Sequence, residues 1–480
     1  MPSSVPAEAP LLRFALPDGR PATLLLGEAS TVLSIEDALV SSWDLAGRPY
    51  ALLRGTGTYR RGLDGRLLWK REATAEGPRL RQRLSAADGE PVVDAARRDA
   101  EAAMISLAGV AAVIPNPDPH GTRVALSNDP SRRALSRDAN GSASAPREGL
   151  GEGLFISRDS GWTGPEESAG IADPSSPGTN GAPRDDTVEA VLRRLQAIVA
   201  MDAGALRDDA ARFLAASGPV GILPPDQYLA LVVRVTEGCS WNACTFCRLY
   251  RDVPFRWKRP DELLAHLAAL REYFGPSIAL RRSVFLGDAN ALCLAHDRLF
   301  PLVERVAARF PGRPLHSFLD AWTGQRRSPS EWRDYAGLGL RRVYVGLETG
   351  DPGLLAWLEK PGSPQDAVDL VGALHEAGIG AGVIVLLGAG GERFAAAHAA
   401  RTAEVLTAMR LGPGDLVYFS EYVDDPGLAY GQRAAGAEDL RPLPPERGAD
   451  QRRAIVDGIR RAPGARPPRH ATYDIREFVY

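Results

Sequence analysis

The sequence contains little cysteine, and most of what it contains is clustered. Four cysteines occur in 480 residues, too few for a small scaffold stapled by disulfides. Three of them, Cys239, Cys244 and Cys247, lie within nine residues of one another, and Cys293 stands alone. In a reducing compartment, clustered thiols bind metal or take part in chemistry more often than they form disulfides. The cysteine distribution therefore predicts one metal or redox centre near residue 240.

An excess of basic residues and a long apolar run are lacking as well. The 57 basic and 60 acidic residues give a net charge of −3, which argues against a dedicated nucleic-acid or membrane-surface protein. The longest uncharged apolar run, 377–391, has 15 residues, fewer than the roughly 18 needed to cross a bilayer. The first fifteen residues lack the apolar core of a signal peptide. We therefore expect a cytoplasmic protein with neither a membrane nor a nucleic acid as its partner.

Composition divides the first 186 residues into two regions. In residues 1–115, short apolar segments are separated by turn signals such as Asp18-Gly19 and Asp64-Gly65, which predicts a small β-rich accessory domain. In residues 116–186, Gly, Pro and Ser make up 28 of 71 residues and aromatic residues are nearly absent. Such a segment buries too little apolar surface to offset its ordering entropy, so we expect a largely disordered linker.

From residue 187 to 425 the pattern becomes regular and predicts a core domain. Six apolar strands are predicted, at 228–235, 283–287, 314–319, 341–347, 381–387 and 415–421. Amphipathic helices separate them, which is typical of a parallel sheet with right-handed crossovers. An open doubly wound sheet and a complete or partial barrel both satisfy this pattern. Residues 426–480 are expected to form a C-terminal extension with one helix.

The cysteine cluster directly follows the first predicted strand of this core. Active-site loops of parallel α/β folds lie at the carboxyl ends of strands, so the cluster stands where chemistry is expected. A structural zinc ion needs four ligands and would have to recruit Cys293 or His296. A [4Fe-4S] cluster normally takes four thiolates, and with three of them one iron keeps an open position for another ligand.

The motif Cys-x4-Cys-x2-Cys, with Phe246 just before the last cysteine, resembles that of radical S-adenosylmethionine (radical SAM) enzymes. The usual spacing in that family has three residues in the first gap, where this chain has four. The resemblance covers about 228–421 and is closest to the branch of the coproporphyrinogen oxidases and the methylthiotransferase core. It implies an α/β fold with a partial (βα)6 TIM-like barrel. It also implies a [4Fe-4S] cluster, S-adenosylmethionine and a one-electron donor such as flavodoxin or ferredoxin.

The resemblance also implies roles for individual residues. Cys239, Cys244 and Cys247 would bind the cluster and carry catalysis, by reductive cleavage of S-adenosylmethionine to a 5′-deoxyadenosyl radical that acts on an unidentified substrate. The remaining cofactor-binding residues would be Phe246, Gly287, Asp288, Asn290, Glu348 and Gly388. Some of them have structural alternatives. Asp288 could cap a following helix, Glu348 could pair with Arg341 or Arg342, and Gly388 could serve a glycine turn before a helix.

The cysteine count excludes those members of the family that bind more than one cluster. Once three cysteines are assigned, only Cys293 remains, too few for the second cluster of a methylthiotransferase or for auxiliary clusters. Two other functions stay open. One is a non-catalytic cluster- or haem-binding chaperone on the same fold, and the other is a zinc-stabilised α/β protein without radical chemistry.

Overall fold

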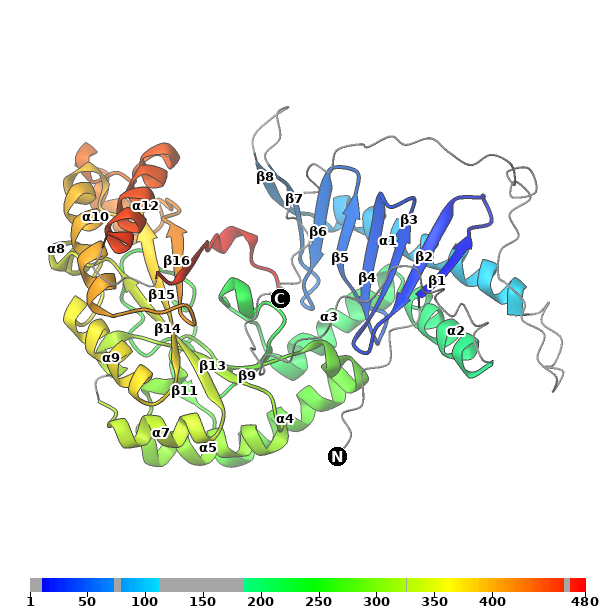
Figure 1. The fold of residues 1–480 in the computed structure, drawn as a ribbon, viewed down its shortest axis with the longest axis horizontal. Coiled ribbons are helices and arrows are strands. Elements are labelled where there is room, and N and C mark those ends of the chain that lie inside the picture. Colours follow the sequence, from blue (N-terminus) through cyan, green and yellow to red (C-terminus); the bar gives the residue numbers. More distant parts are fainter. Residues whose placement is uncertain (1–10, 73–78, 112–184, 325, 462–466) are drawn as a thin grey trace, which may run out of the picture. The chain divides into compact units, whose positions relative to one another are not determined.

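The computed structural model describes residues 11–72, 79–111, 185–324, 326–461 and 467–480 (Figure 1). The predicted linker lies almost entirely outside the described residues. The chain divides into two compact units, one of Met1–Thr56 with Glu90–Asp202 and one of Gly57–Gly89 with Ala203–Tyr480. These cuts fall at other positions than the predicted domain bounds, because residues 57–89 pack with the C-terminal part of the chain.

The first unit contains an antiparallel meander that agrees with the predicted β-rich character. Its strands are β1 (Leu11–Ala15), β2 (Pro21–Leu26), β3 (Ser30–Ile35), β4 (Leu39–Asp44) and β5 (Pro49–Arg54), each paired with the next. Leu24, Leu33 and Trp43 are almost completely buried on one face of the sheet. The helices α1 (Ala86–Ala111), whose first residues belong to the second unit, and α2 (Asp185–Val199) complete this part.

The second unit begins with three antiparallel strands, β6 (Gly57–Arg61), β7 (Leu67–Arg71) and β8 (Leu80–Leu84). The predicted turn joins β6 to β7, where Gly65 has a φ of +84° that favours glycine. The helix α3 (Ala203–Ser217) follows in sequence within this unit.

A seven-stranded parallel sheet forms the core of the second unit. Its strands, in spatial order, are β9 (Leu231–Arg234), β12 (Val284–Gly287), β13 (Leu315–Leu319), β14 (Leu340–Glu348), β15 (Gly380–Leu387), β16 (Leu416–Glu421) and β17 (Arg469–Thr472). All neighbouring pairs are parallel. A doubly wound sheet reverses its strand order at a switch point, and this one follows the chain throughout. The arrangement is therefore a partial barrel, and six of its strands are the predicted ones.

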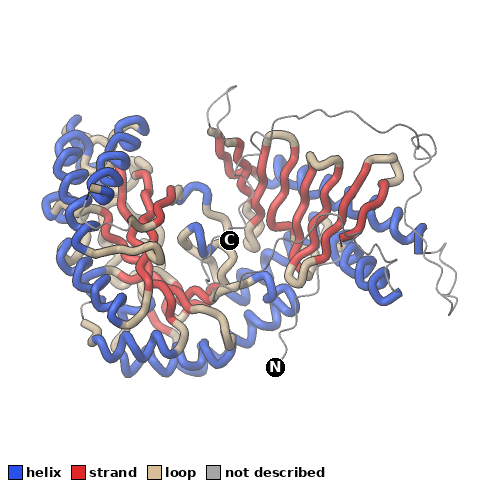
Figure 2. Tube along the Cα trace, in the orientation of Figure 1, coloured by secondary structure: helices blue, strands red, loops and turns tan. Residues whose placement is uncertain are grey.

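Helices lie on the outer side of the curved sheet (Figures 1 and 2). They are α4 (Pro260–Phe274), α5 (His296–Arg309), α7 (Pro329–Gly337), α8 (Pro352–Trp357), α9 (Pro364–Glu376), α10 (Gly391–Ala408) and α12 (Pro445–Arg460). The short helices α6 (Ala321–Gly324) and α11 (Ala429–Ala434) follow β13 and β16 in the chain. Local signals set several starts: Ser328 and Ser363 each cap a helix whose first residue is proline. Among the described residues, no helix is long and apolar enough to cross a membrane.

The last residues connect the two edges of the parallel sheet. Among the described strands, β17 and β9 are the edges and do not pair with each other. The Tyr473 amide donates a hydrogen bond to the Phe419 carbonyl on β16 (2.8 Å). Seven residues later, the Tyr480 hydroxyl donates to the Ala230 carbonyl (2.7 Å) and accepts from the Val232 amide (3.1 Å). The segment 473–480 therefore spans the open side of the barrel.

The carboxylate of Asp226 binds several polar side chains toward the amino ends of the strands. It lies in the short turn Pro225–Gln227 before β9. Its carboxylate accepts hydrogen bonds from the hydroxyls of Tyr344 (2.5 Å) and Tyr418 (2.7 Å) and pairs with Arg342 (3.1 Å). One carboxylate thus connects β9, β14 and β16 at the end of the barrel opposite to the cysteine loop.

Asp226→Ala should destabilise the barrel, because two phenols and a guanidinium lose their common acceptor. We expect the free energy of unfolding to fall by about 2 kcal/mol, within the cost of leaving buried polar groups unpaired. Urea unfolding followed by circular dichroism measures the change. The exposed Asp208→Ala on α3 is the control and should leave the midpoint unchanged; equal midpoints for both variants would contradict the role of Asp226.

Candidate functional site

The cysteine-bearing loop starts and ends on a small antiparallel pair, β10 (Thr236–Glu237) with β11 (Arg256–Trp257). Gly238 opens the loop with a φ of +75°, and a Cβ there would lie 2.6 Å from the Val253 carbonyl oxygen, so glycine is required. Asn242 also has a positive φ of +50°, a conformation that asparagine tolerates better than most residues. The Asn242 amide donates to the Sγ of Cys239 (3.4 Å). The loop fold thus brings backbone donors to the thiols.

One arginine holds the loop together. The guanidinium of Arg251 donates to the carbonyls of Asn242 (2.6 Å), Cys244 (2.5 Å) and Cys247 (3.1 Å). These three bonds fix the backbone around two of the three cysteines. The sequence pattern carries no signal for this role, because a single arginine after a cysteine motif is common in any charged loop.

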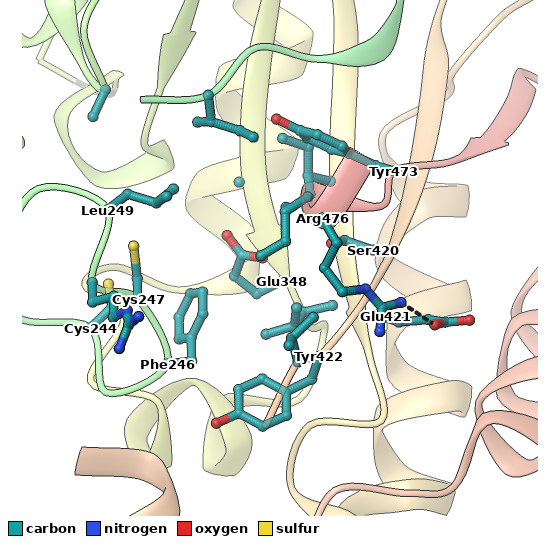
Figure 3. Close-up of a pocket in the computed structure, with 18 of the residues that line it drawn as sticks. Cys244, Phe246, Cys247, Leu249, Glu348, Ser420, Glu421, Tyr422, Tyr473 and Arg476 are labelled. Atoms are coloured by element: carbon teal, nitrogen blue, oxygen red, sulfur yellow. Dashed lines mark hydrogen bonds and ion pairs between the residues drawn. The ribbon is translucent and has the colours of Figure 1, made fainter. Parts of the chain in front are cut away.

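The three cysteines line a cavity of about 980 Å³ at the carboxyl ends of the strands (Figure 3). All residues that line it belong to the second compact unit. Burial raises the pKa of the Cys244 thiol to about 11 and also raises the pKa of Cys247. Since thiolates, not thiols, bind metals, a metal centre here would release protons as it forms.

The donor set fits a cluster better than a single ion. Among the described residues, no group of three or more His, Cys, Asp or Glu side chains is arranged to share one metal ion. Neither Cys293 nor His296, the two candidates for a fourth zinc ligand, lines the cavity. His296 instead stacks on Phe300 with ring centroids 5.1 Å apart. Three soft thiolates on one loop suit an iron–sulfur cluster, in which each thiolate binds its own iron.

Glu348 and Lys360 form an ion pair beside the thiols. Glu348 ends β14, is 7% exposed, and its Oε1 lies 3.0 Å from the Nζ of Lys360. Burial alone would lower the pKa of Lys360, but Glu348 and Cys244 together raise it above its ordinary value. Arg341 and Arg342, the partners that the sequence suggested for Glu348, make other contacts. Arg342 pairs with Asp226, and Arg341 donates to the Ala336 carbonyl. The sequence did not point to Lys360, which lies on the chain far from the cysteines.

Asp288 supports the loop instead of facing the cavity. Its carboxylate pairs with Arg234 of β9 (3.1 Å) and accepts a hydrogen bond from the Gly238 amide (3.1 Å). Burial raises the pKa of Asp288. It caps no helix either, because Asn290 is the residue that precedes the short turn Ala291–Cys293. Asp288 thus joins the ends of β9 and β12 where the cysteine loop begins.

Asn290 and Asp320 form a polar wall of the cavity. The Asn290 side-chain amide donates to the Ser240 hydroxyl (2.9 Å) and to the Asp320 carboxylate. Asp320 also accepts from the amide of Thr323 (2.7 Å). Asp320 follows β13 directly, and its position at a strand end was the signal that could have identified it.

The predicted cofactor-binding residues therefore separate into two groups. Phe246, Asn290 and Glu348 line the cavity together with the three cysteines, and Gly287, Asp288 and Gly388 do not. Gly388 has a φ of +80° and its amide donates to Gln451 (2.9 Å), in the turn between β15 and α10. This is the glycine turn before a helix considered as its alternative.

The wall opposite the thiols comes from β16, the chain terminus and β8. Arg476 pairs there with Asp474 (2.7 Å) and with Glu421 (3.2 Å), as Figure 3 shows for the latter. Residues 79–83 of the β8 region line the same cavity, although they are about 160 positions before the cysteines. Sequence reasoning missed this contribution because nothing local to β8 marks a binding site.

The fold is a parallel α/β barrel that presents three thiols to a cavity at its strand ends. Residues 233–400 match the family model of the Radical SAM superfamily. The chain therefore contains a radical SAM domain, and the match does not specify a reaction. Enzymes of this family use a [4Fe-4S] cluster and S-adenosylmethionine. The predicted closeness to the coproporphyrinogen-oxidase branch stays a prediction.

Comparison with other proteins adds distant structural likeness. No curated protein matches the chain. The radical S-adenosylmethionine methyltransferase TsrM from Kitasatospora setae is 17% identical, covering 45% of this chain and 41% of its own, with a TM-score of 0.33. Coproporphyrinogen III oxidase (HemN) from Escherichia coli is 16% identical, covering 52% and 55%, with a TM-score of 0.37. Methylornithine synthase (PylB) is 16% identical, covering 54% and 75%, with a TM-score of 0.35. The chain thus spans about two fifths of the length of TsrM.

Arg251→Ala should loosen the cysteine loop, because three carbonyl groups lose their common donor. We expect a reconstituted cluster to lose iron to a chelator about tenfold faster, equivalent to roughly 1.4 kcal/mol for hydrogen bonds to a charged group. Anaerobic chelation followed by visible absorption measures the rate. Arg271→Ala on α4 removes an exposed arginine and serves as the control. Equal rates for the two variants and the unaltered chain would show that Arg251 does not hold the loop.

Proposed function

We propose that this chain binds one [4Fe-4S] cluster through Cys239, Cys244 and Cys247 and cleaves S-adenosylmethionine reductively to form a 5′-deoxyadenosyl radical. The radical would act on a substrate held in the same cavity. The observation that carries the proposal is the meeting of three thiols from one loop at one cavity, within the segment that matches the family. When bound, the cluster supplies the electron for cleavage, and the protein supplies position and the exclusion of water.

The residues around the loop prepare it for three thiolates. Arg251 and Asp288 fix the backbone before and between the cysteines. Lys360 lies close enough to Cys244 to oppose the rise in its pKa. A positive charge at this place stabilises thiolates, and its pairing with Glu348 keeps the ammonium in position.

The rest of the cavity offers complementary groups for S-adenosylmethionine. Phe246 presents an aromatic face, Glu348 and Asp320 present carboxylates, and Asn290 presents an amide. Carboxylates of this kind can accept hydrogen bonds from an ammonium group or from ribose hydroxyls. Phe318, Ile384 and Leu386 give the same cavity an apolar wall, which limits water near a reactive radical.

The cavity is large for a single small-molecule site. Its volume of about 980 Å³ lies at the upper end of the range for a single small-molecule site, which is about 300–1,000 Å³. In the proposed arrangement, S-adenosylmethionine occupies the part near the cysteines and an organic substrate lies toward Arg476 and Tyr422, on the opposite wall (Figure 3).

Anaerobic reconstitution with iron and sulfide tests the proposal. We expect about four irons per chain and formation of 5′-deoxyadenosine when dithionite and S-adenosylmethionine are added. Cluster formation with haem uptake and no cleavage would instead support the chaperone. Stoichiometric zinc without iron uptake would support the zinc-stabilised protein, and either result would refute the radical enzyme.

Cys244→Ala should abolish both the cluster and the cleavage, because only two thiolates remain. Cys293→Ala is the matched control within the same chain and should retain both, since its thiol does not line the cavity. Iron content, visible absorption and chromatography of 5′-deoxyadenosine are the measurements. Loss of the cluster in the Cys293 variant, or cleavage by the Cys244 variant, would contradict the ligand assignment.

Glu348→Gln should weaken the binding of S-adenosylmethionine about tenfold, because it removes a charged acceptor and leaves Lys360 unpaired in a buried site. Equilibrium dialysis with the reconstituted protein gives the dissociation constant. Glu376→Gln at the end of α9 controls for the loss of a carboxylate. An unchanged constant for Glu348→Gln would remove this residue from the cofactor site.

A further inference from the structure

Arginine side chains from two distant parts of the chain line the wall of the cavity opposite the thiols. We call these residues of the β8 region and the C-terminal segment the arginine wall: Arg79, Arg81, Arg83 and Arg476. Asp474 and Glu477, which pair with three of these arginines, do not line the cavity. A ligand in the cavity therefore meets guanidinium groups before it meets the carboxylates that pair with them.

Arg476 is held along one edge of its guanidinium. Its Nε and Nη2 donate to the two carboxylate oxygens of Asp474 (2.7 and 2.8 Å), and Nη2 also donates to Glu421 (3.2 Å). Within the described part of the chain, no group accepts a hydrogen bond from Nη1, and the side chain is 38% exposed. Because the guanidinium is planar and rigid, the two N–H bonds of Nη1 stay available to an acceptor in the cavity.

Ser420 offers a second donor at the same wall. It precedes Glu421 on β16, and its side chain lines the cavity and is drawn with Arg476 in Figure 3. The residue is 5% exposed, and its hydroxyl makes no hydrogen bond to any other described residue. A buried hydroxyl of this kind is costly unless a ligand or a water molecule binds it.

The charges of this wall favour a ligand with one negative charge. The four guanidinium groups of the arginine wall and the carboxylates of Glu421, Asp474 and Glu477 give a net charge of +1. Lys70 and Glu72, which contact the same network, add one charge of each sign. A monoanion neutralises this surplus. A dianion would bring an excess negative charge next to Glu421, which lines the cavity itself.

Apolar side chains line the interior of the cavity. Phe318 of β13, Ile384 of β15 and Ile475 of the C-terminal segment are half-buried there. Tyr344 of β14 lines the cavity as well, but its hydroxyl donates to Asp226 (2.5 Å), so it presents only ring carbon atoms to a ligand. The rings of Phe318 and Tyr344 pack with their centroids 5.9 Å apart. An apolar ligand body would displace water from these surfaces, which is favourable.

We propose that the substrate is a monocarboxylic acid with an apolar body, and that Nη1 of Arg476 binds its carboxylate. The inference rests on the proposed function and names the substrate class for the same cavity. Ser420 donates a second hydrogen bond to the carboxylate, and the apolar body lies against Phe318, Ile384 and Ile475. Because the carboxylate is held at the wall opposite the thiols, the body of the substrate, and not its carboxylate, lies next to the bound cofactor (Figure 3).

A matched pair of probes tests the proposal on the reconstituted protein with S-adenosylmethionine bound. 4-Phenylbutanoate has an apolar body and a carboxylate, and 4-phenylbutan-1-ol has the same body without a charge. We expect equilibrium dialysis to give a dissociation constant about tenfold lower for the acid than for the alcohol, as for a hydrogen bond to a charged group.

Substitutions separate the two parts of the site. Arg476→Gln should abolish the preference for the acid, and so should Arg476→Lys, which keeps a positive charge beside Asp474 but lacks the planar fork. Arg271→Gln on α4 removes an exposed arginine and should keep the preference. Ile475→Ala should weaken the acid and the alcohol alike, by about fivefold, because it removes apolar contact only.

Several outcomes would overturn the carboxylate site. These are equal affinity for acid and alcohol in the unaltered chain, an unchanged preference in both Arg476 variants, or tighter binding of 4-phenylbutyl phosphate than of the acid. Weaker binding of S-adenosylmethionine in the Arg476 variants would overturn it too, because the guanidinium would then belong to the cofactor site. Failure of the proposed function has a separate signature, in which the unaltered chain prefers the acid but forms no 5′-deoxyadenosine with dithionite.

Discussion

Parallel pairing of consecutive strands is the constraint on which the rest of the site depends. Because β9, β12, β13, β14, β15 and β16 pair in chain order, their carboxyl ends form one rim. Cys239, Asn290, Asp320, Glu348 and Glu421 each follow or end a different strand, and all of them line one cavity. Residues almost 200 positions apart in the chain thus line the same cavity. The hydrogen bonds between the strands fix where each residue lies along the barrel axis.

Charged side chains then fix the loop on that rim. The buried pair of Arg234 and Asp288 joins the ends of β9 and β12, and Asp288 also holds the first amide of the loop. A buried pair of this kind contributes little net stability but is costly to break, so its effect here is positional. Arg251 and Lys360 add two positive charges near the cysteines. Three thiolates in a partly buried site would repel one another without such compensation.

The sequence predicted the six core strands and most helices, because continuous apolar runs and proline-led helix starts are local signals. Ser328 and Ser363, for example, each precede a proline that begins a helix. The seventh strand, β17, was missed, since its residues are exposed and carry no apolar pattern. Arg251, Lys360 and Asp320 were missed for a related reason. Their roles arise from contacts across the fold, and a single charged residue has no spacing that reveals its partner.

By itself, the sequence predicted the class of chemistry, from three cysteines on one loop after a buried strand and too few others for a second cluster. It also determined the parallel α/β core, because the hydrophobic periodicity of strands and helices is a local property of the sequence. Only the tertiary structure decided which polar groups meet the cysteines. Asp288 pairs with Arg234, and Glu348 pairs with Lys360. A buried charge needs an opposite charge close to it in space, and that partner can be distant in the sequence. The fold also placed residues 79–83 at the cavity. They are far from the cysteines in the chain, so no local sequence pattern predicts this contact.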